Sequence, residues 1–314
     1  MTKVLIVTII ITGNQNSYNK KMGRILTMKI LVTGATGKFG SKVIEILLKT
    51  VPASELAVSV RNPEKAEGLK ARGVEVRRGD FDLPETLDTA FAGVDRLLII
   101  SADGDNETRI RQHANAVAAA ERAGVKFIAY TSLANAQESN NLFAPTHQAT
   151  EKAILKTGIP YSFLRNNWYL ENEIPSIQGV LAGAPWVTSA ENGKVGWAPQ
   201  QDYAEAAAVV LSGNGHENTI YELSGEELTQ EELVSALGAV LGKEITLQRV
   251  NDSAYAEIMK GAGVPDFLIP LLVDIQKSIR EGSLDFESYD FEKLLGRPAA
   301  PISEALSQIV SQIS

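Results

Sequence analysis

The sequence predicts a doubly wound parallel α/β sheet, followed by a smaller and mainly helical lobe in the C-terminal part of the chain. From Met28 to about residue 170, short apolar runs alternate with helical patterns of about 10–15 residues. The first apolar run ends at a turn that contains three glycines. Beyond about residue 170 the alternation weakens and amphipathic helical patterns dominate.

Six short apolar runs in the first half are predicted to be strands of one sheet. They are bounded by glycine, proline or polar residues, which is typical of buried parallel strands. The segments between them have helical periodicity, so each strand connects to the next through a crossover helix. The predicted strands are 29–33, 56–60, 74–76, 96–100, 127–131 and 161–165, and the predicted helices are 38–50, 63–72, 84–91, 109–123 and 145–156.

The second half is predicted to divide between the sheet domain and the lobe. A helix over 203–211 and a strand over 219–223 continue the α/β pattern, so we expect 200–225 to return to the sheet domain formed by 28–170. The stretch 174–193 is rich in glycine, alanine and proline and is expected to form loops with short pieces of structure. The lobe is therefore assigned to 171–199 and 226–314, with helices over 231–241, 254–261, 267–279 and 302–313.

Residues 1–27 are predicted to be a poorly ordered N-terminal extension, with Met28 beginning the functional chain. The apolar run at 4–11 is much shorter than the roughly 20 residues of a membrane-spanning helix. No small-residue cleavage site follows it, which disfavours a signal peptide. A signal peptide and an additional β-strand are the alternatives for this segment.

The composition excludes several classes of function. The chain has 314 residues and no cysteine, which excludes disulfides, a thiolate nucleophile and cysteine-ligated metals. It has three histidines, too few for a histidine-rich metal site, so we expect no metal. The formal net charge of −8 disfavours nucleic-acid and membrane partners, since both need a positive field. These features favour a cytoplasmic protein, either monomeric or homodimeric, that acts on small molecules.

The strongest motif is the glycine turn GATGKFG at residues 34–40, placed between the first strand and the first helix. Gly34 permits a tight turn, and Gly37 allows the backbone to approach a pyrophosphate. Gly40 allows the helix to pack closely against the strand. The helix N-terminus adds free N–H groups and a partial positive charge. The sequence therefore predicts a dinucleotide phosphate site at this turn.

Two residues after later strands bear on which cofactor is bound. Arg61 follows the second strand, about 20 residues after the glycines, where an acidic residue selects NAD and an arginine accommodates the 2′-phosphate of NADP. A solvated arginine is the alternative. Asp80 follows the third strand and is placed to meet the adenine edge, with a turn or helix-capping role as the alternative. The pattern favours NADPH over NADH.

Together these motifs carry a family resemblance. The chain from Met28 onward resembles the NmrA-like branch of atypical short-chain dehydrogenases, and more narrowly bacterial NAD(P)H:quinone oxidoreductases of the type-2 group and triphenylmethane reductases. The resemblance implies NADPH as hydride donor and a quinone or related aromatic acceptor. It rests on GATGKFG at 34–40, VRNPEKA at 60–66, KFIAYTSL at 126–133, EK at 151–152 and LRNNWYLEN at 164–172.

By position, the resemblance also implies roles for individual residues. Arg61 would hold the 2′-phosphate, Ser101 would lie beside the cofactor, and the loop around Asn106 would close over it. The pyrophosphate would be held by Gly34, Ala35, Thr36, Gly37, Lys38 and Phe39, and the nicotinamide end and acceptor pocket would be approached by Asn166, Asn167, Trp168, Tyr169 and Glu171.

One position departs from the broader superfamily, whose members use a serine with Tyr-x-x-x-Lys as their acid–base group. Ser132 and Lys152 are present, but the tyrosine position is Gln148, and an amide cannot protonate an alkoxide. Quinone reduction tolerates this loss, because a hydroquinone anion is a weak base that water can protonate. The protein then has mainly to stack a flat acceptor against the nicotinamide.

Candidate catalytic and acceptor-binding residues follow from this view. Lys152 would hydrogen-bond the nicotinamide ribose, and His147 would donate a proton near the acceptor, since imidazole titrates near neutrality. Trp168, Tyr169 and Phe143 would form a flat apolar wall, with Tyr169 also a candidate catalytic residue. The plain alternatives are surface positions for Lys152 and His147, and core packing for the aromatic residues.

Three functions remain open at this point. The first is an NADPH-dependent quinone reductase. The second is a non-enzymatic NAD(P)-binding redox sensor of the NmrA-like type, which the missing tyrosine at position 148 fits equally well. The third is an isomerase or epimerase of the extended short-chain class, which Gln148 disfavours.

Overall fold

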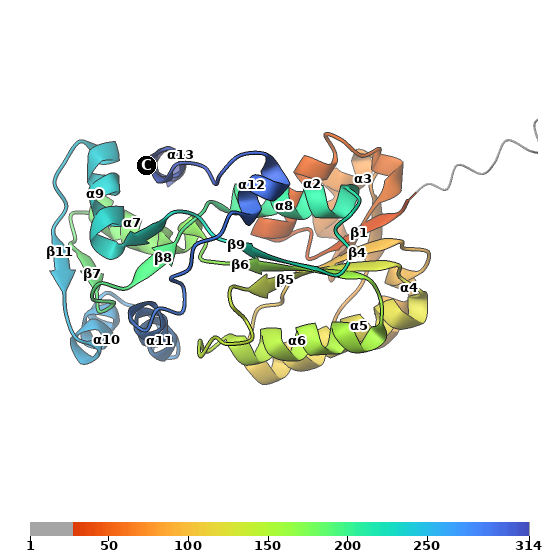
Figure 1. Ribbon diagram of the computed structural model, residues 1–314, viewed down its shortest axis with the longest axis horizontal. Helices are drawn as coiled ribbons and strands as arrows, with labels where there is room; N and C mark the ends of the chain where they lie inside the picture. The colour runs from red at the N-terminus through yellow and green to blue at the C-terminus, as the bar shows by residue number, and fades with distance from the viewer. Residues whose placement is uncertain (1–27, 314) are drawn as a thin grey trace, which may run out of the picture.

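A single parallel sheet organises the structure, a computed structural model that describes residues 28–313 (Figure 1). The strand order is β3-β2-β1-β4-β5-β6-β9, so the predicted doubly wound Rossmann-type sheet is confirmed. Expectations about residues 1–27 lie outside the described residues. The strands are β1 (Ile30–Thr33), β2 (Leu56–Val60), β3 (Glu75–Arg78), β4 (Arg96–Ile99), β5 (Phe127–Leu133), β6 (Tyr161–Asn166) and β9 (Thr219–Leu223).

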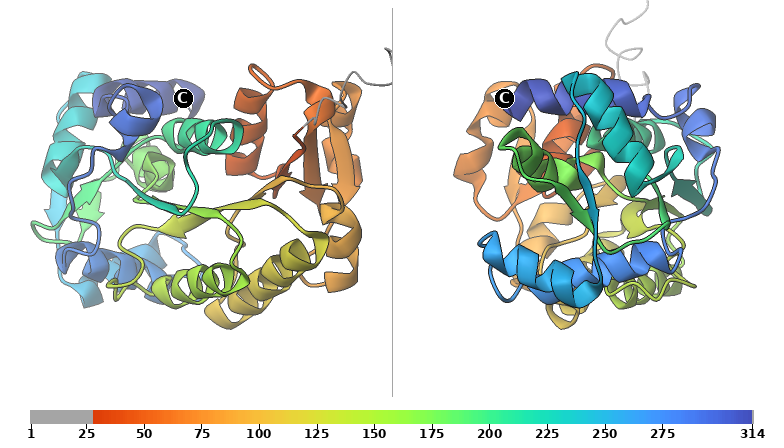
Figure 2. Two further views of the ribbon diagram at one scale, coloured as in Figure 1. Left: turned by 45° about the vertical axis from the view of Figure 1, so that its right-hand side comes forward. Right: turned by 90° about the vertical axis from the view of Figure 1, so that its left-hand side faces the viewer.

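Helices cover both faces of the sheet, as the views in Figures 1 and 2 agree. Because both faces are covered, the central strands are mostly apolar, and β1, β2, β4 and β5 are buried at every residue. On one face lie α2 (Lys38–Leu47), α8 (Gln200–Ser212) and α12 (Asp290–Leu295), with α3 (Glu67–Ala71) beside β3; on the other lie α4 (Pro84–Phe91), α5 (Asn106–Ala123) and α6 (Ala144–Thr157).

The strand order reverses between β1 and β4, which are neighbours in the sheet. From β1 the chain proceeds outward through β2 to β3 and then crosses back to β4 on the other side of β1. A crevice opens at the carboxyl ends of the strands at such a reversal, and ligands of doubly wound sheets bind there. This position defines where the candidate site is sought.

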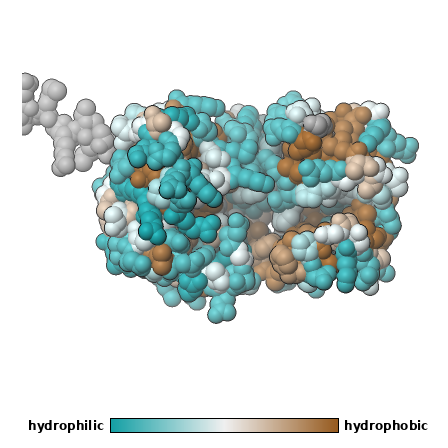
Figure 3. Space-filling view, turned by 180° about the vertical axis from the view of Figure 1, so that it is seen from behind, coloured by the Kyte–Doolittle hydropathy of each residue, from teal (hydrophilic) through white to brown (hydrophobic). Residues whose placement is uncertain are grey.

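The second half supplies a lobe at the carboxyl edge of the sheet, at the left of Figure 1. Two short two-stranded sheets, β8 with β10 and β7 with β11, connect its helices. Seen from behind, apolar side chains gather on the lobe half, at the right of Figure 3. The lobe consists of α7 (Ile174–Leu181), β7 (Trp186–Thr188), β8 (Lys194–Gly196), β10 (Glu227–Thr229), α9 (Gln230–Leu241), β11 (Leu247–Arg249), α10 (Asp252–Gly261), α11 (Ile269–Arg280) and α13 (Ile302–Ile313).

The division of the chain differs from the expectation in two respects. Segment 174–193 contains a regular helix, α7, whose Ile177 and Val180 are buried in the lobe core. Helix α12, within the segment assigned to the lobe, packs instead on α8 and β9, with Phe291 in the core of the sheet domain. Both features depend on contacts between distant segments, which local composition does not encode.

Residues 28–313 lack two further features. No helix in this range is both long and apolar enough to cross a membrane. The same residues contain no group of three or more histidine, aspartate or glutamate side chains arranged to hold a metal ion.

Candidate active site

Two threonines fix the crevice between β1 and β4. The hydroxyl of Thr33, the last residue of β1, accepts a hydrogen bond of 2.9 Å from the Ile100 amide just after β4. The hydroxyl of Thr131 in β5 accepts one of the same length from the Ser101 amide. The chain leaving β4 is therefore held from both sides, and Ser101 lies at the strand reversal.

The glycine turn has the geometry expected of a phosphate-binding turn. Gly34 has φ +61°, a left-handed conformation that glycine adopts without strain. A Cβ on Gly40 would lie 2.4 Å from the Gly34 carbonyl oxygen and 2.9 Å from Ala35 Cα, so helix and turn pack too closely for any side chain there. A Cβ on Gly37 would crowd the same carbonyl oxygen at 3.2 Å.

The start of α2 fits an anion. Its N-cap is Gly37, which has no side chain to cap the helix, and the first turn has no acidic residue. The backbone N–H groups of Lys38, Phe39 and Gly40 have no acceptor within residues 28–313. Helix N–H groups without partners, together with the positive end of the helix dipole, attract a phosphate. The predicted cradle for the cofactor pyrophosphate, Gly34 to Phe39, is thus present as an assembled unit.

Arg61 lies at the same edge, directly after β2. Its side chain is exposed and forms no hydrogen bond or ion pair with the described residues, so its guanidinium is free for a ligand. Arg78, also exposed, ends β3 and pairs with Val60, which places a second cation near Arg61. Asp80 forms a turn in which its Oδ1 accepts from the Asp82 amide at 3.0 Å, the alternative considered for this residue.

Tyr169 connects the glycine turn with the segment after β6. Its ring stacks on Phe39 of the turn, with centroids 5.8 Å apart and planes at 8°. Its hydroxyl accepts a hydrogen bond of 2.8 Å from Asn166 Nδ2, and burial raises its pKa. The Oδ1 atom of Asn166 is buried without a partner in the described chain. This amide oxygen is thus available to a ligand at the nicotinamide end of the predicted site.

Asn167 and Glu171 hold the lobe against the sheet domain. Asn167 Nδ2 donates to Ser224 Oγ and to the Leu284 carbonyl, both at 3.0 Å. Both carboxylate oxygens of Glu171 accept from the Gln200 amide at the start of α8, at 3.1 and 2.9 Å. The side chain of Glu171 is therefore engaged with the start of α8.

Trp168 points into the lobe, where it meets a carboxyl group. Its indole Nε1 and that of Trp197 each donate to Glu173 Oε1 at 3.1 Å. Glu173 forms no ion pair within the described chain, and its burial raises its pKa. Trp168 also packs on the apolar core of the lobe. One part of the indole thus packs in this core. Trp168 as a whole is half buried and follows β6 at the carboxyl edge of the sheet.

The buried guanidinium of Arg109 contacts Ser101. Arg109, in the first turn of α5, is 6% exposed and forms no ion pair in residues 28–313. Its Nη2 donates to Ser101 Oγ at 2.8 Å and contacts His147 Nε2 at 3.2 Å. The guanidinium carbon lies 5.6 Å from the centroid of the Phe143 ring. The structure therefore brings Ser101, Phe143 and His147 together around an arginine that the sequence did not single out.

Both ring nitrogens of His147 are engaged with other residues of the protein. Its Nε2 faces Arg109, which only donates, so Nε2 is the acceptor and Nδ1 carries the proton, donated to Tyr130 Oη at 2.8 Å. Burial, and then the charge of Arg109, lowers the pKa of His147 well below its usual value. The predicted proton donor is therefore a buried neutral imidazole with both nitrogens engaged, and the exposed position considered as its alternative does not occur.

The side-chain amide of Asn106 is hydrogen-bonded to other residues of the protein. Its Nδ2 donates to the Leu142 carbonyl and its Oδ1 accepts from Thr146 Oγ1, both at 2.7 Å. These bonds tie the start of α5 to the loop before α6, where Phe143 lies. Asn106 therefore shapes the wall beside the crevice by holding this loop in place.

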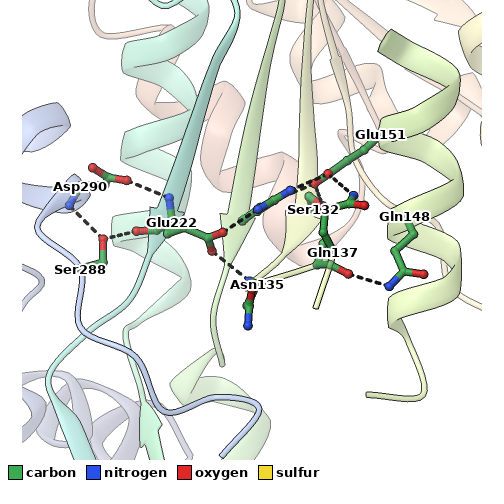
Figure 4. Close-up of polar contacts among 10 residues, drawn as sticks. Ser132, Asn135, Gln137, Gln148, Glu151, Glu222, Ser288 and Asp290 are labelled. Atoms are coloured by element: carbon green, nitrogen blue, oxygen red, sulfur yellow. Dashed lines mark hydrogen bonds and ion pairs between the residues drawn. The ribbon is translucent and has the colours of Figure 1, made fainter. Parts of the chain in front are cut away.

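Ser132 belongs to a buried ionic network on the α6 face of the sheet (Figure 4). Its hydroxyl donates to Glu151 Oε1 at 2.6 Å. Glu151 in turn accepts two hydrogen bonds from Arg165, at 2.9 and 2.8 Å, and Arg165 also pairs with Glu222 at 2.8 Å. The hydroxyl proton of the serine in the superfamily's acid–base set is thus held by Glu151.

Lys152 and Gln148 line a cavity along α6. Gln148 Nε2 donates to the Ala136 carbonyl at 2.9 Å (Figure 4). Lys152 is exposed and, with Gln148, lines a cavity of about 600 Å³ along α6 to which Leu155, Tyr161 and Ile220 contribute. No residue of the glycine turn, nor Arg61 or Ser101, lines this cavity. Lys152 is thus at an exposed position, the alternative considered for it.

The comparison with protein families agrees with this architecture. The model of the NmrA-like family matches residues 27–285, which include the sheet domain and most of the lobe. The chain belongs to the NmrA-like family. The resemblance inferred from the sequence motifs is therefore confirmed.

Curated relatives of this NmrA-like chain include several reductases. Quinone oxidoreductase 2 of Escherichia coli is 41% identical over 281 residues, covering 89% of this chain and 98% of the relative. NAD(P)H azoreductase of Xenophilus azovorans is 28% identical over 278 residues, covering 88% and 96%. The alignments extend over nearly the whole length of both relatives.

Solved structures of NmrA-like relatives match the model closely. The NADPH-dependent quinone oxidoreductase of Escherichia coli, solved in complex with NADPH, superposes with a TM-score of 0.86 at 41% identity, covering 90% of this chain and 99% of that one. Triphenylmethane reductase of Citrobacter sp., solved with NADP(H), gives a TM-score of 0.84 at 43% identity, covering 90% and 100%. Both relatives were thus solved with a nicotinamide cofactor of the phosphorylated type.

Sequence reasoning missed part of this NmrA-like site. Arg109 and Tyr130 lie inside an alanine-rich helix and a buried strand, where the pattern indicates only core. The sequence did indicate Arg109, because it is a charged residue on the buried face in the first turn of the helix that follows β4. The residues overlooked at the crevice are Thr33, Arg78, Arg109, His113, Tyr130 and Thr131.

Proposed function

We propose that the chain is an NADPH-dependent oxidoreductase that transfers hydride to a quinone-type acceptor. The observation that carries the proposal is the assembled dinucleotide cradle: free N–H groups at the start of α2, with an unpartnered Arg61 at the same strand edge. The 41% identical relative named quinone oxidoreductase 2 supports the acceptor class. The two relatives solved with NADPH and NADP(H) support the cofactor.

Each group of residues has its own role in binding. The cradle residues, Gly34 to Phe39, hold the pyrophosphate, and Arg61 binds the 2′-phosphate bidentately. The Phe39–Tyr169 stack and the free Oδ1 of Asn166 shape the nicotinamide end, with Phe143 and Trp168 as apolar walls for a flat acceptor. Bound NADPH supplies the hydride. Because Ser132 and Gln148 are engaged elsewhere, the site favours an acceptor that water can protonate.

The test is the oxidation of NADPH by the purified full chain, followed by its absorbance, with and without 1,4-benzoquinone and repeated with NADH. We expect saturable, quinone-dependent oxidation with a much lower KM for NADPH than for NADH. Tight NADPH binding without turnover across benzoquinones and naphthoquinones would contradict the proposal and favour a redox sensor. Equal use of both cofactors would contradict the assignment of Arg61.

A further inference from the structure

We propose that Ser101 donates a hydrogen bond to the acceptor oxygen that becomes negatively charged, and that Arg109 orients its hydroxyl for this role. The inference rests on the proposed function, which it deepens by naming a catalytic residue. It starts from the hydrogen-bond directions around Ser101. It also accounts for an arginine that is buried without a carboxylate partner in the described chain.

The donors around Ser101 all point toward its oxygen. Arg109 Nη2 donates to Ser101 Oγ at 2.8 Å, and a guanidinium has no acceptor atom, so the direction of this bond is fixed. Arg109 also occupies the Nε2 lone pair of His147, so the Nδ1 proton of this histidine goes to Tyr130 Oη at 2.8 Å.

A second histidine fixes the other side of Tyr130. The Ala102 amide donates to His113 Nε2 at 2.9 Å, so the proton of this imidazole is on Nδ1, 2.8 Å from Thr150 Oγ1. Tyr130 therefore receives a proton from His147 and cannot give its own to His113. Its hydroxyl interacts instead with the hydroxyls of Thr150 and Ser101.

The hydroxyl protons of this network can be assigned in chain order, ending at Ser101. Thr150 Oγ1 donates to the Thr146 carbonyl at 2.7 Å, so its proton is used. The Tyr130 hydroxyl, which cannot donate to His113, donates to Ser101 Oγ in this arrangement, so the proton of Ser101 is left for a ligand, and Ser101 is only half buried. Its amide is held by Thr131 at the strand reversal, where the nicotinamide is expected. The free proton is thus directed into the crevice.

The chemistry needs such a donor at this place. A quinone that gains a hydride, with its two electrons, becomes a hydroquinone monoanion, and solvent water later supplies the proton. During transfer, negative charge grows on an oxygen of the acceptor. A hydroxyl whose oxygen accepts from a cation is a stronger donor than an isolated one, and a preorganised donor lowers the cost of this charge. Ser101 would share its proton with the oxyanion without giving it up.

The first measurement compares turnover of the wild type, Ser101→Ala and Ser101→Thr, with Ser212→Ala as control. Ser212 lies in α8, where its hydroxyl bonds only the Ala208 carbonyl at 2.8 Å. We expect Ser101→Ala to lower kcat about 10²-fold, the usual loss for one oxyanion donor. The KM for NADPH should stay unchanged, and the loss should grow for quinones whose hydroquinone anions are more basic. Ser101→Thr should recover most of the activity.

The second measurement needs no turnover. 4-Nitrophenol is a phenol whose anion absorbs visible light, and it serves as a stand-in for the hydroquinone anion when NADP⁺ is present. We expect the wild type to bind it as the phenolate at a pH where free nitrophenol is mostly neutral. Ser101→Ala should lose this ionisation. Arg109→Lys, which keeps the charge but not the two-way donation, should lose part of it.

The outcomes separate this inference from the proposed function. If the wild type reduces no quinone but ionises nitrophenol through Ser101, the proposed acceptor is wrong and the donor assignment stands. If quinone is reduced and Ser101→Ala only raises the KM for NADPH, with kcat and nitrophenol ionisation unchanged, Ser101 is a cofactor contact and the inference is overturned. An Arg109→Lys variant that keeps full ionisation would remove Arg109 from it.

Discussion

Ser132, near the end of β5, donates its hydroxyl to Glu151 Oε1 at 2.6 Å. In short-chain dehydrogenases of the usual type, the serine after the fifth strand assists proton transfer together with a tyrosine. In this chain the corresponding serine stabilises a carboxylate that is itself held by Arg165. We therefore expect the reaction to proceed without it.

Replacing this serine should separate stability from activity. We expect Ser132→Ala to keep kcat and KM, because Glu151 retains both bonds from Arg165, and to lower the free energy of unfolding by about 1 kcal/mol. Glu151→Ala should cost about 3–5 kcal/mol, since it removes the carboxylate from a buried pair. Quinone kinetics and urea unfolding measure the two effects. A large loss of kcat in Ser132→Ala would restore the serine to the mechanism.

Arg61 should determine the choice between NADPH and NADH. We expect Arg61→Ala to raise the KM for NADPH by a factor that corresponds to about 1.5–3 kcal/mol, the typical contribution of a charge-assisted contact. The KM for NADH should hardly change, because NADH lacks the 2′-phosphate. Arg122→Ala is the matched control, since Arg122 is exposed and paired with Asp88 on the face formed by α4 and α5. Equal losses for both cofactors would contradict the role of Arg61.

Substitutions at two glycines of the turn should affect different properties, one cofactor binding and the other stability. Gly37→Val should abolish cofactor binding and leave the fold largely intact, because the added side chain blocks the approach of a pyrophosphate. Gly40→Ala should instead lower the free energy of unfolding by about 1–3 kcal/mol, since its Cβ would meet backbone atoms at 2.4 and 2.9 Å. Calorimetry of NADPH binding and thermal unfolding distinguish the two variants. Normal NADPH affinity in Gly37→Val would mean that the phosphate site lies elsewhere.

Glu173 should make the protein less stable as the pH rises. Burial between two indoles raises its pKa above the unfolded value of about 4.3, so the folded state holds a proton that the unfolded state has lost. Its contribution is therefore fully present below about pH 4.3 and is lost as the pH rises through the folded pKa. Glu173→Gln keeps an acceptor for Trp168 and Trp197 but has no charge, and should remove this loss. Identical pH profiles of melting temperature in variant and wild type would show that Glu173 is already ionised in the fold.

The two buried histidines should destabilise the protein in acid. Burial lowers the pKa of His113 to about 3 and that of His147 well below its usual value, so both are neutral in the fold. Each contribution is present above the unfolded pKa of about 6.5 and falls by about 1.4 kcal/mol per pH unit below it. The glutamine of His147→Gln can accept from Arg109 and donate to Tyr130. This variant should halve the combined slope of the two histidines, in free energy of unfolding per pH unit, between pH 6.5 and 5. Unfolding by urea at several pH values measures it.

The sequence predicted the parts of the fold whose signals are local. The seven strands of the large sheet and the glycine turn were expected, because apolar runs, periodicity and glycine spacing are visible within a few residues. The short strands β7, β8, β10 and β11 were missed, since each has only three residues and pairs with a distant segment. Length and composition carry no information about such pairings.

The same distinction holds for the candidate site. Gly34 to Phe39 and Arg61 were found from spacing along the chain. The environment of His147 was not, because its ring is set by Arg109 and Tyr130, 38 and 17 residues away in sequence. A histidine at the start of a helix is as compatible with an exposed position as with this buried one. Only the packing of α5 against α6 decides between them.

The position of α12 has a consequence for how the protein is made. The sheet is completed by β9, at residues 219–223, and the face above it by α12, at residues 290–295. The first half of the sheet domain can therefore close its core only after residues up to 295 have been made. Until β9 has been made, β6 exposes an unpaired edge that other nascent chains can join. Synthesis of this protein thus passes through a long interval in which chaperones have a defined strand edge to protect.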